Sequence, residues 1–213
     1  MAISNYGELK ARLSAYLFHQ RLANLYDDCT QLFETSANSR LRVLPMEASV
    51  LLTTVSGDVA LPTDYITWRT VRPTVATITA PSSLPPYQEL EYVHPAYLPP
   101  VGRGFDRLFT IEGNTFKVRP VDDRADAYEL HYYQKTPTLV NATTGNLATN
   151  WLITEYPNAY LFGVLTELFA AQRNAEAAQL YKARRDETFQ EIIQRYAMTT
   201  GATSPRVRTA EYF

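Results

Sequence analysis

Apolar residues recur with the period of an α-helix at both ends of this chain and with a period of two in between. Residues 5–40 predict two helices with a break near residues 19–21, and so short a break predicts an antiparallel helical hairpin. Asn5 suits the N-cap of the first helix, and Glu8 follows three positions later, as in a capping box. The predicted apolar stripes of this hairpin are Tyr6, Leu9, Leu13, Tyr16 and Leu17, then Leu22, Leu25, Tyr26, Cys29, Leu32, Phe33 and Ala37.

A second pair of helices is predicted near the end of the chain. Pro157 is favoured in a first helical turn, and Asn174 interrupts the pattern and can cap a further helix that runs to about Met198. The predicted stripes of this pair are Tyr160, Leu161, Val164, Leu165, Leu168 and Phe169, then Ala177, Tyr181, Thr188, Phe189, Ile192, Ile193 and Tyr196.

The middle of the chain alternates apolar and polar residues, which predicts short β-strands. A hairpin stands out where Glu112-Gly113-Asn114 separates two alternating runs, with Phe109 and Ile111 facing Phe116 and Val118. The predicted strands are residues 49–55, 59–61, 66–72, 88–93, 108–111, 115–119 and 127–135. Residues 79–104 hold six prolines and two glycines and predict a long loop around the fourth of these strands.

These elements predict an α+β fold. A helix with one apolar stripe is stable only against a partner, so the two hairpins should close a four-helix bundle that carries an inserted antiparallel β domain. The predicted divisions are an N-terminal helical hairpin, residues 1–44; an inserted β-rich domain, residues 45–150; a C-terminal helical hairpin, residues 151–200; and an extended C-terminal tail, residues 201–213.

Charge and cysteine content narrow the class of protein. Twenty basic against twenty-two acidic side chains give a net charge of −2, which argues against a general nucleic-acid binder. Cys29 is the single cysteine, so neither an internal disulfide nor a cysteine-based zinc site is expected. No run approaches the roughly 20 apolar residues of a membrane span, and residues 1–17 lack the apolar core of a signal peptide.

No residue pattern predicts a catalytic, cofactor or metal site. The chain lacks GxxxxGK[ST] and GxGxxG, and His19, His94 and His131 fall in separate predicted elements. Cys29 lies on an apolar stripe and is expected in the core. A hydrolase remains an alternative through Glu89 and Glu91, which share a strand face, or through the acidic turn Asp122–Asp126. The simpler interpretations are a negative strand edge and a solvated turn.

Aromatic residues and the C-terminal tail point to protein contacts instead. Tyrosine and phenylalanine are enriched in interfaces, although some must fill the β core. The aromatic residues that gather in the β region are Tyr65, Tyr87, Tyr92, Tyr97, Phe105, Tyr132 and Tyr133. The tail carries Arg206 and Arg208 and ends in Tyr212 and Phe213, which suits either docking into a groove of a partner or plain disorder.

Several short segments, in this order, are similar to one known family. They are Tyr6–Lys10; Leu32–Glu34 followed by Ser39–Arg42 and Met46–Glu47; Leu61–Tyr65; and Asn150–Leu152 with Tyr156–Gly163, followed by Ala175–Ile193. Together they span nearly the whole chain and resemble the head-to-tail adaptor (connector) proteins of tailed bacteriophages and related gene transfer agents.

The resemblance implies a structural virion protein and not an enzyme. Adaptors of this family form a ring, usually of twelve copies, beneath the portal at the capsid vertex. They join it to a stopper or tail component in the neck of the virion, after assembly in the host cytoplasm, and leave a channel through which genomic DNA passes without specific binding. Relatives often engage the portal with the C-terminal segment, which implies portal binding by Arg206, Arg208, Tyr212 and Phe213. The main alternative is a protein-interaction or assembly module that forms no ring.

Overall fold

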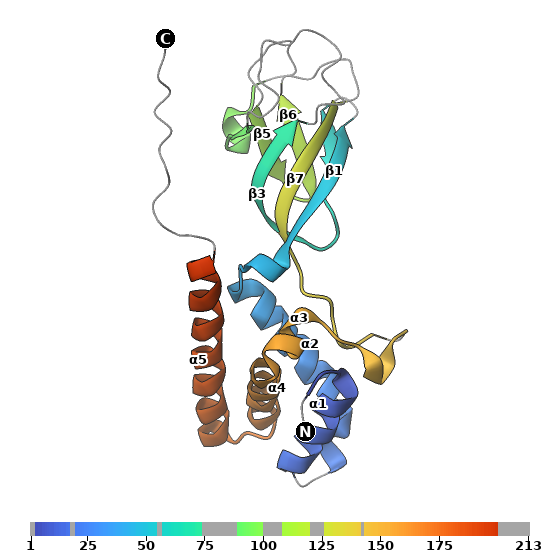
Figure 1. Ribbon diagram of the computed structural model, residues 1–213, viewed down its shortest axis with the longest axis vertical. Coiled ribbons are helices and arrows are strands. Elements are labelled where there is room, and N and C mark those ends of the chain that lie inside the picture. Colours follow the sequence, from blue (N-terminus) through green and yellow to red (C-terminus); the bar gives the residue numbers. More distant parts are fainter. Residues whose placement is uncertain are drawn as a thin grey trace. The chain divides into compact units, whose positions relative to one another are not determined.

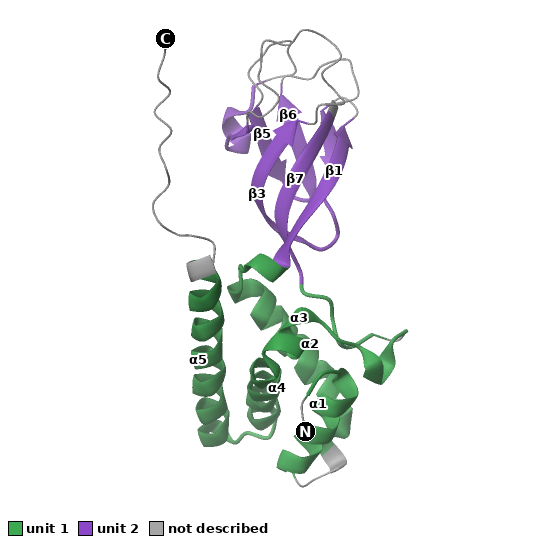
Figure 2. Cartoon of the chain, in the orientation of Figure 1, with its two compact units in different colours: residues 1–45, 136–213 green, residues 46–135 purple. Residues whose placement is uncertain are grey.

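The chain forms two compact units, a helical unit of residues 1–45 and 136–213 and a β unit of residues 46–135 (Figure 2). The computed structural model describes residues 3–17, 20–54, 57–73, 89–99, 108–119, 126–141 and 143–199. The fold class is α+β, as predicted. Residues 136–150, which the sequence-based division grouped with the insertion, belong to the helical unit.

Within the described residues the helical unit contains five α-helices, one more than predicted (Figure 1). They are α1 (Tyr6–Leu17), α2 (Tyr26–Arg40), α3 (Trp151–Glu155), α4 (Pro157–Ala171) and α5 (Ala175–Thr199), with the 3₁₀ turns η1 (Gln20–Leu25), η2 (Leu44–Met46) and η5 (Gly145–Leu147) beside them. The unpredicted helix is α3. The Asn150 side chain caps it by accepting a hydrogen bond from Ile153 N at 3.0 Å. It ends at Tyr156, because the residue before a proline is driven out of the helical conformation.

Helix α4 is central, because α1, α2 and α5 all pack against it. Its predicted stripe from Tyr160 to Leu168 is buried. The buried Arg185 on α5 lies 3.9 Å from Glu167 on α4 and donates to Asp186 at 2.9 Å, and Asp186 also pairs with Arg40 on α2 at 2.7 Å. Charged side chains therefore link α2, α4 and α5.

Three residues that the helical period assigned to buried stripes are exposed instead. They are Tyr16 on α1, Leu32 on α2 and Ile193 on α5. Leu32 lies about 100° around α2 from Phe33 and therefore off the packed face. The buried residues of α2 are Tyr26, Cys29, Thr30, Phe33, Glu34 and Ala37. The prediction for these side chains was wrong. The period places them near the packed face of each helix, but the face that is actually buried is narrower than the pattern suggested.

Helices α2 and α4 approach most closely at Gly163. A Cβ atom built on Gly163 would lie 2.0 Å from Cδ2 of Phe33. The Phe33 ring is fully buried, with the Tyr160 ring 4.9 Å away and the Phe189 ring 6.1 Å away between centroids. Position 163 therefore needs a glycine because the Phe33 ring leaves no room for a side chain, and not because of its backbone conformation.

A buried carboxylate ties the returning chain to α2. Glu34 is 6% exposed and accepts hydrogen bonds from the Thr138 hydroxyl at 2.6 Å, Leu139 N at 2.8 Å and the Tyr160 hydroxyl at 3.2 Å. Asn150 donates to the same Tyr160 oxygen at 2.7 Å and to the Pro137 carbonyl at 2.7 Å. Burial raises the pKa of Glu34 above its usual value, and the three donors partly offset that rise.

The described part of the β unit contains two sheets, with strand orders β1-β7-β3 and β2-β6-β5-β4. The strands are β1 (Glu47–Thr54), β2 (Asp58–Ala60), β3 (Tyr65–Pro73), β4 (Glu91–Tyr92), β5 (Leu108–Glu112), β6 (Thr115–Arg119) and β7 (Asp126–Gln134). The predicted hairpin is confirmed, since Phe109 pairs with Val118 and Ile111 with Phe116 around a turn at Gly113. The prediction of a wholly antiparallel domain is wrong at β4, which pairs parallel with β5.

Both sheets contribute to one apolar core. Leu90 N donates to Val71 O at 2.9 Å beside β3, and Val118 N donates to Gly57 O at 2.8 Å just after β1, so backbone bonds join the sheets on both sides. The core residues are Leu52, Leu61, Val71, Leu90, Phe109, Phe116, Val118, Tyr128, Leu130 and Tyr132. Asp64, in the segment that enters β3, accepts from the Tyr132 hydroxyl at 3.1 Å and fixes that entry on β7.

We expect Gly163→Ala to destabilise the helical unit by more than about 1 kcal/mol, although alanine favours a helix over glycine. The added methyl group must displace the Phe33 ring, which Tyr160 and Phe189 hold in place. Denaturant unfolding followed by far-ultraviolet circular dichroism measures the change. Adding Phe33→Leu should recover part of the loss, and a Gly163→Ala variant at least as stable as the parent would contradict the close approach.

We expect the stability of a Glu34→Gln variant relative to the parent to rise with pH. The folded state raises the pKa of Glu34, so protonation favours folding, and this contribution is lost as the pH rises from about 4.5 through the folded pKa. The glutamine side chain does not titrate, so the variant does not lose stability in this way as the pH rises. Thermal unfolding between pH 4 and pH 8 tests this, with Glu191→Gln on the exposed face of α5 as the control. Parallel pH profiles for the parent and Glu34→Gln would refute it.

Candidate interaction surfaces

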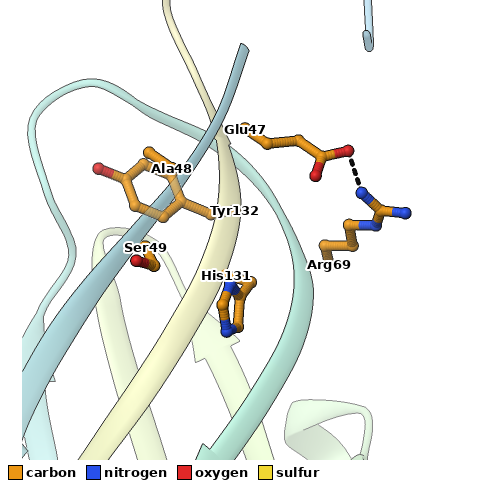
Figure 3. A pocket seen from close by; sticks show the side chains of 6 residues that line it. All are labelled: Glu47, Ala48, Ser49, Arg69, His131 and Tyr132. Carbon is orange, nitrogen blue, oxygen red and sulfur yellow. Dashed lines mark hydrogen bonds and ion pairs between the residues drawn. The ribbon is translucent and has the colours of Figure 1, made fainter. Parts of the chain in front are cut away.

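One pocket of about 200 Å³ opens on the β unit, on the face of the sheet β1-β7-β3 (Figure 3). It is lined by Glu47, Ala48, Ser49, Arg69, His131 and Tyr132. Figure 3 shows Glu47 and Arg69 joined as an ion pair, which links β1 to β3 on either side of β7. The pocket is small, and both polar and apolar atoms line it.

The sheet register also places a serine, a histidine and a carboxylate close together. Ser49 lies opposite His131 in the pairing of β1 with β7, and His131 Nε2 lies 3.5 Å from a carboxylate oxygen of Glu129. The sequence did not predict this set, because only the register brings residue 49 beside residue 131. A serine becomes a nucleophile when a hydrogen-bonded base takes its proton, and among the described residues no side-chain hydrogen bond joins Ser49 to His131. These are the residue types of a hydrolytic triad without its chain of hydrogen bonds.

The carboxylates considered for hydrolysis do not form an acid–base pair. Glu89 makes an ion pair with Arg72 at 2.8 Å, and both side chains are about half exposed. Glu91 is exposed on β4. In the acidic turn, Asp122 and Asp123 lie outside the described residues, while Asp126 begins β7. The Glu89 carboxylate is therefore engaged by an arginine and not by a second carboxyl group.

The histidines and the cysteine occupy structural positions where they are described. His94 Nδ1 accepts from Ala96 N at 3.2 Å and caps the 3₁₀ turn η4 (Pro95–Tyr97), while His19 lies outside the described residues. Cys29 is buried as predicted, and burial raises the pKa of its thiol to about 11, so the thiol is protonated at neutral pH. Among the described residues, no group of three histidine, cysteine or acidic side chains is placed to hold a metal ion.

The aromatic residues of the β unit divide between core and surface. Tyr132 is buried and stacks on Tyr65 at 5.9 Å, and the half-buried Trp68 stacks on Tyr92 at 5.5 Å. Tyr97 is 80% exposed. Tyr87 and Phe105 lie outside the described residues. The aromatic cluster is thus partly core and partly a surface able to contact another protein.

The helical unit exposes apolar side chains of its own. Tyr16 on α1, Leu32 on α2 and Leu180 on α5 are 44%, 57% and 54% exposed. The predicted portal-binding residues Arg206, Arg208, Tyr212 and Phe213 lie outside the described residues, as do Gly102 and Gly104 of the loop. No helix in the described part of the chain combines the length and apolar character needed to cross a membrane.

The segments that resemble a known family have structural roles in the helical unit. Phe33, Glu34, Asn150, Tyr160 and Gly163 all belong to them, and together these residues form the close contact and the buried hydrogen-bond network described above. In the β unit, Asp64 of the segment Leu61–Tyr65 fixes the entry to β3. The resemblance therefore rests on residues that determine the fold.

Comparison with protein-family models matches residues 4–209 to the family described as SU10 adaptor protein. The match covers the described residues of both units except Ile3, and it extends past α5 to include Arg206 and Arg208. A search of curated proteins gives no match.

The adaptors of this family are structural proteins of bacteriophages, which do not form an enzyme class. Membership implies a place in the neck of the virion and contacts with portal and tail components. Because the match leaves out only residues 1–3 and 210–213, the chain belongs to the SU10 adaptor protein family of bacteriophage head-to-tail adaptors.

Proposed function

We propose that the chain assembles as a ring of twelve copies beneath the portal at the capsid vertex. The ring joins the portal to the stopper or tail component and leaves a channel for genomic DNA, which passes through without specific binding during ejection. The subunits are made in the host cytoplasm and assemble there. The observation that carries this proposal is the family match over residues 4–209, which includes both units of the fold.

The helical unit is the part that we assign to the ring. In this proposal the N-terminal and C-terminal hairpins, residues 1–44 and 151–200, act as one four-helix bundle, and the β segment works as an insertion that reaches a neighbouring neck protein. Two properties support this division: a helical core held by buried polar groups, and exposed apolar side chains on α1, α2 and α5. Rigid packing suits a part that must hold its neighbours in register.

The charge of the chain suits passage of DNA. Each lysine or arginine contact with a phosphate adds affinity, so a strongly basic channel would retain the DNA that must move through it. With a net charge of −2 the chain as a whole has no such excess of basic residues. We therefore propose that DNA passes through the channel and is not bound by it.

Negative-stain electron microscopy and native mass spectrometry of the purified chain, alone and with the portal of the same phage, test the ring. We expect closed rings of twelve copies, alone or on the portal. A protein that stays monomeric or dimeric under both conditions would favour the alternative, an assembly module that forms no ring.

We also propose that the C-terminal tail, residues 201–213, binds the portal through Arg206, Arg208, Tyr212 and Phe213. Arginine and aromatic side chains dominate binding energy at protein interfaces, which supports this assignment. Deleting residues 202–213 should abolish portal binding and change the melting temperature of the chain by less than about 2 °C. Pull-down on the portal and differential scanning fluorimetry measure the two effects. A large loss of stability would place the tail in the core instead.

A further inference from the structure

Two helices of the helical unit each expose a large apolar side chain. Helix α1 buries Tyr6, Leu9, Leu13 and Leu17, and Tyr16 is 44% exposed beside that stripe. Helix α5 buries Arg185, Phe189 and Ile192, and Leu180, on the opposite side of the helix, is 54% exposed. Both side chains meet water in the isolated subunit, which costs free energy that a partner surface would recover.

An exposed charge lies one helical turn before each of these side chains. Arg12 precedes Tyr16 on α1, and Glu176 precedes Leu180 on α5. Residues four positions apart share a helix face, so each apolar side chain and its charge form one small patch. In the described structure neither Arg12 nor Glu176 has an ion-pair partner. We call Arg12 and Tyr16 the α1 patch, and Glu176 and Leu180 the α5 patch.

The two patches belong to different sides of the helical unit. Helices α1 and α5 both pack against α4, and α4 lies between them (Figure 1). The α5 patch lies on the face of its helix opposite the buried Arg185, Phe189 and Ile192, and the α1 patch lies at the edge of the buried stripe of α1. One subunit therefore cannot cover its own α1 patch with its own α5 patch.

We propose that the α1 patch of one copy docks on the α5 patch of the next copy, an inference that rests on the ring proposed above. Arg12 then meets Glu176, and Tyr16 packs on Leu180, so opposite charges and apolar groups coincide. The two patches lie on different helices, so the contact joins unlike surfaces of two copies. The contact is consequently head-to-tail, the kind that propagates around a ring and closes it.

Charge reversal tests this contact in the full chain. Arg12→Glu and Glu176→Arg each place like charges across the interface, and each should raise the concentration needed for half of the chain to enter rings by about tenfold or more. The double variant Arg12→Glu/Glu176→Arg restores opposite charges and should recover rings. Mass photometry and negative-stain microscopy, with and without the portal, count the rings. Thermal unfolding confirms that these exposed substitutions leave the fold intact.

Helix α2 provides a matched control. Asp28 is exposed, has no ion-pair partner among the described residues and lies one turn before the exposed Leu32. The pair thus has the same design as each patch but lies outside the proposed contact. We expect Asp28→Arg to form rings like the parent.

The outcomes separate this contact from the ring itself. If the parent chain forms no rings, alone or with the portal, the proposed function fails. If the parent forms rings and either single variant forms them equally well, or the double variant does not recover them, the ring stands and this contact is overturned. Loss of rings in Asp28→Arg matching that of the single variants would equally overturn it.

Discussion

The helical unit depends on one buried carboxylate. Glu34 leaves water on α2 and is satisfied by two donors from the returning chain, Thr138 and Leu139, and by Tyr160 on α4. A buried acceptor is costly unless its donors are all in place, so this site admits one arrangement of the segments that supply them. Asn150 fixes Tyr160 from the other side and caps α3, and the Phe33 ring against Gly163 sets the distance between α2 and α4. Apolar burial makes the helices pack, and these polar contacts select how they pack.

The family resemblance is explained by the same residues. Short segments far apart along the chain look unrelated until Glu34, Asn150 and Tyr160 are found in one hydrogen-bond network. All three residues are buried. A family defined by such residues shares a scaffold, and the surfaces that choose partners are free to differ among its members. The proposed contacts of this chain lie on Tyr16, Leu180 and the tail, outside the hydrogen-bond network of Glu34, Asn150 and Tyr160.

Periodicity predicted the elements whose neighbours are close in sequence. The stripe of α4 and the hairpin at Gly113 were predicted because local spacing decides both. Contacts between distant segments escaped prediction. Leu32 has the right period and lies off the packed face, and the two-residue strand β4 pairs parallel with β5, although the local pattern suggested antiparallel pairing. The neighbours of Ser49 and His131 became known only through the register of β1 on β7. The donors of Glu34 lie more than a hundred residues along the chain, where no local pattern points to them.

The β unit interrupts the sequence of the helical unit, and this sets the order in which the two units can fold during synthesis. The β unit is continuous from residue 46 to residue 135 and has its own core, so it can fold while the ribosome is still adding residues. Helix α2 must wait through that interval, because Glu34 and Phe33 find their partners only when residues 138–163 emerge. Helix α5, which carries one half of the proposed contact between copies, leaves the ribosome after all of them. The α5 half of the contact thus emerges last, so a nascent chain cannot bind neighbours on both sides until its whole helical unit has been made.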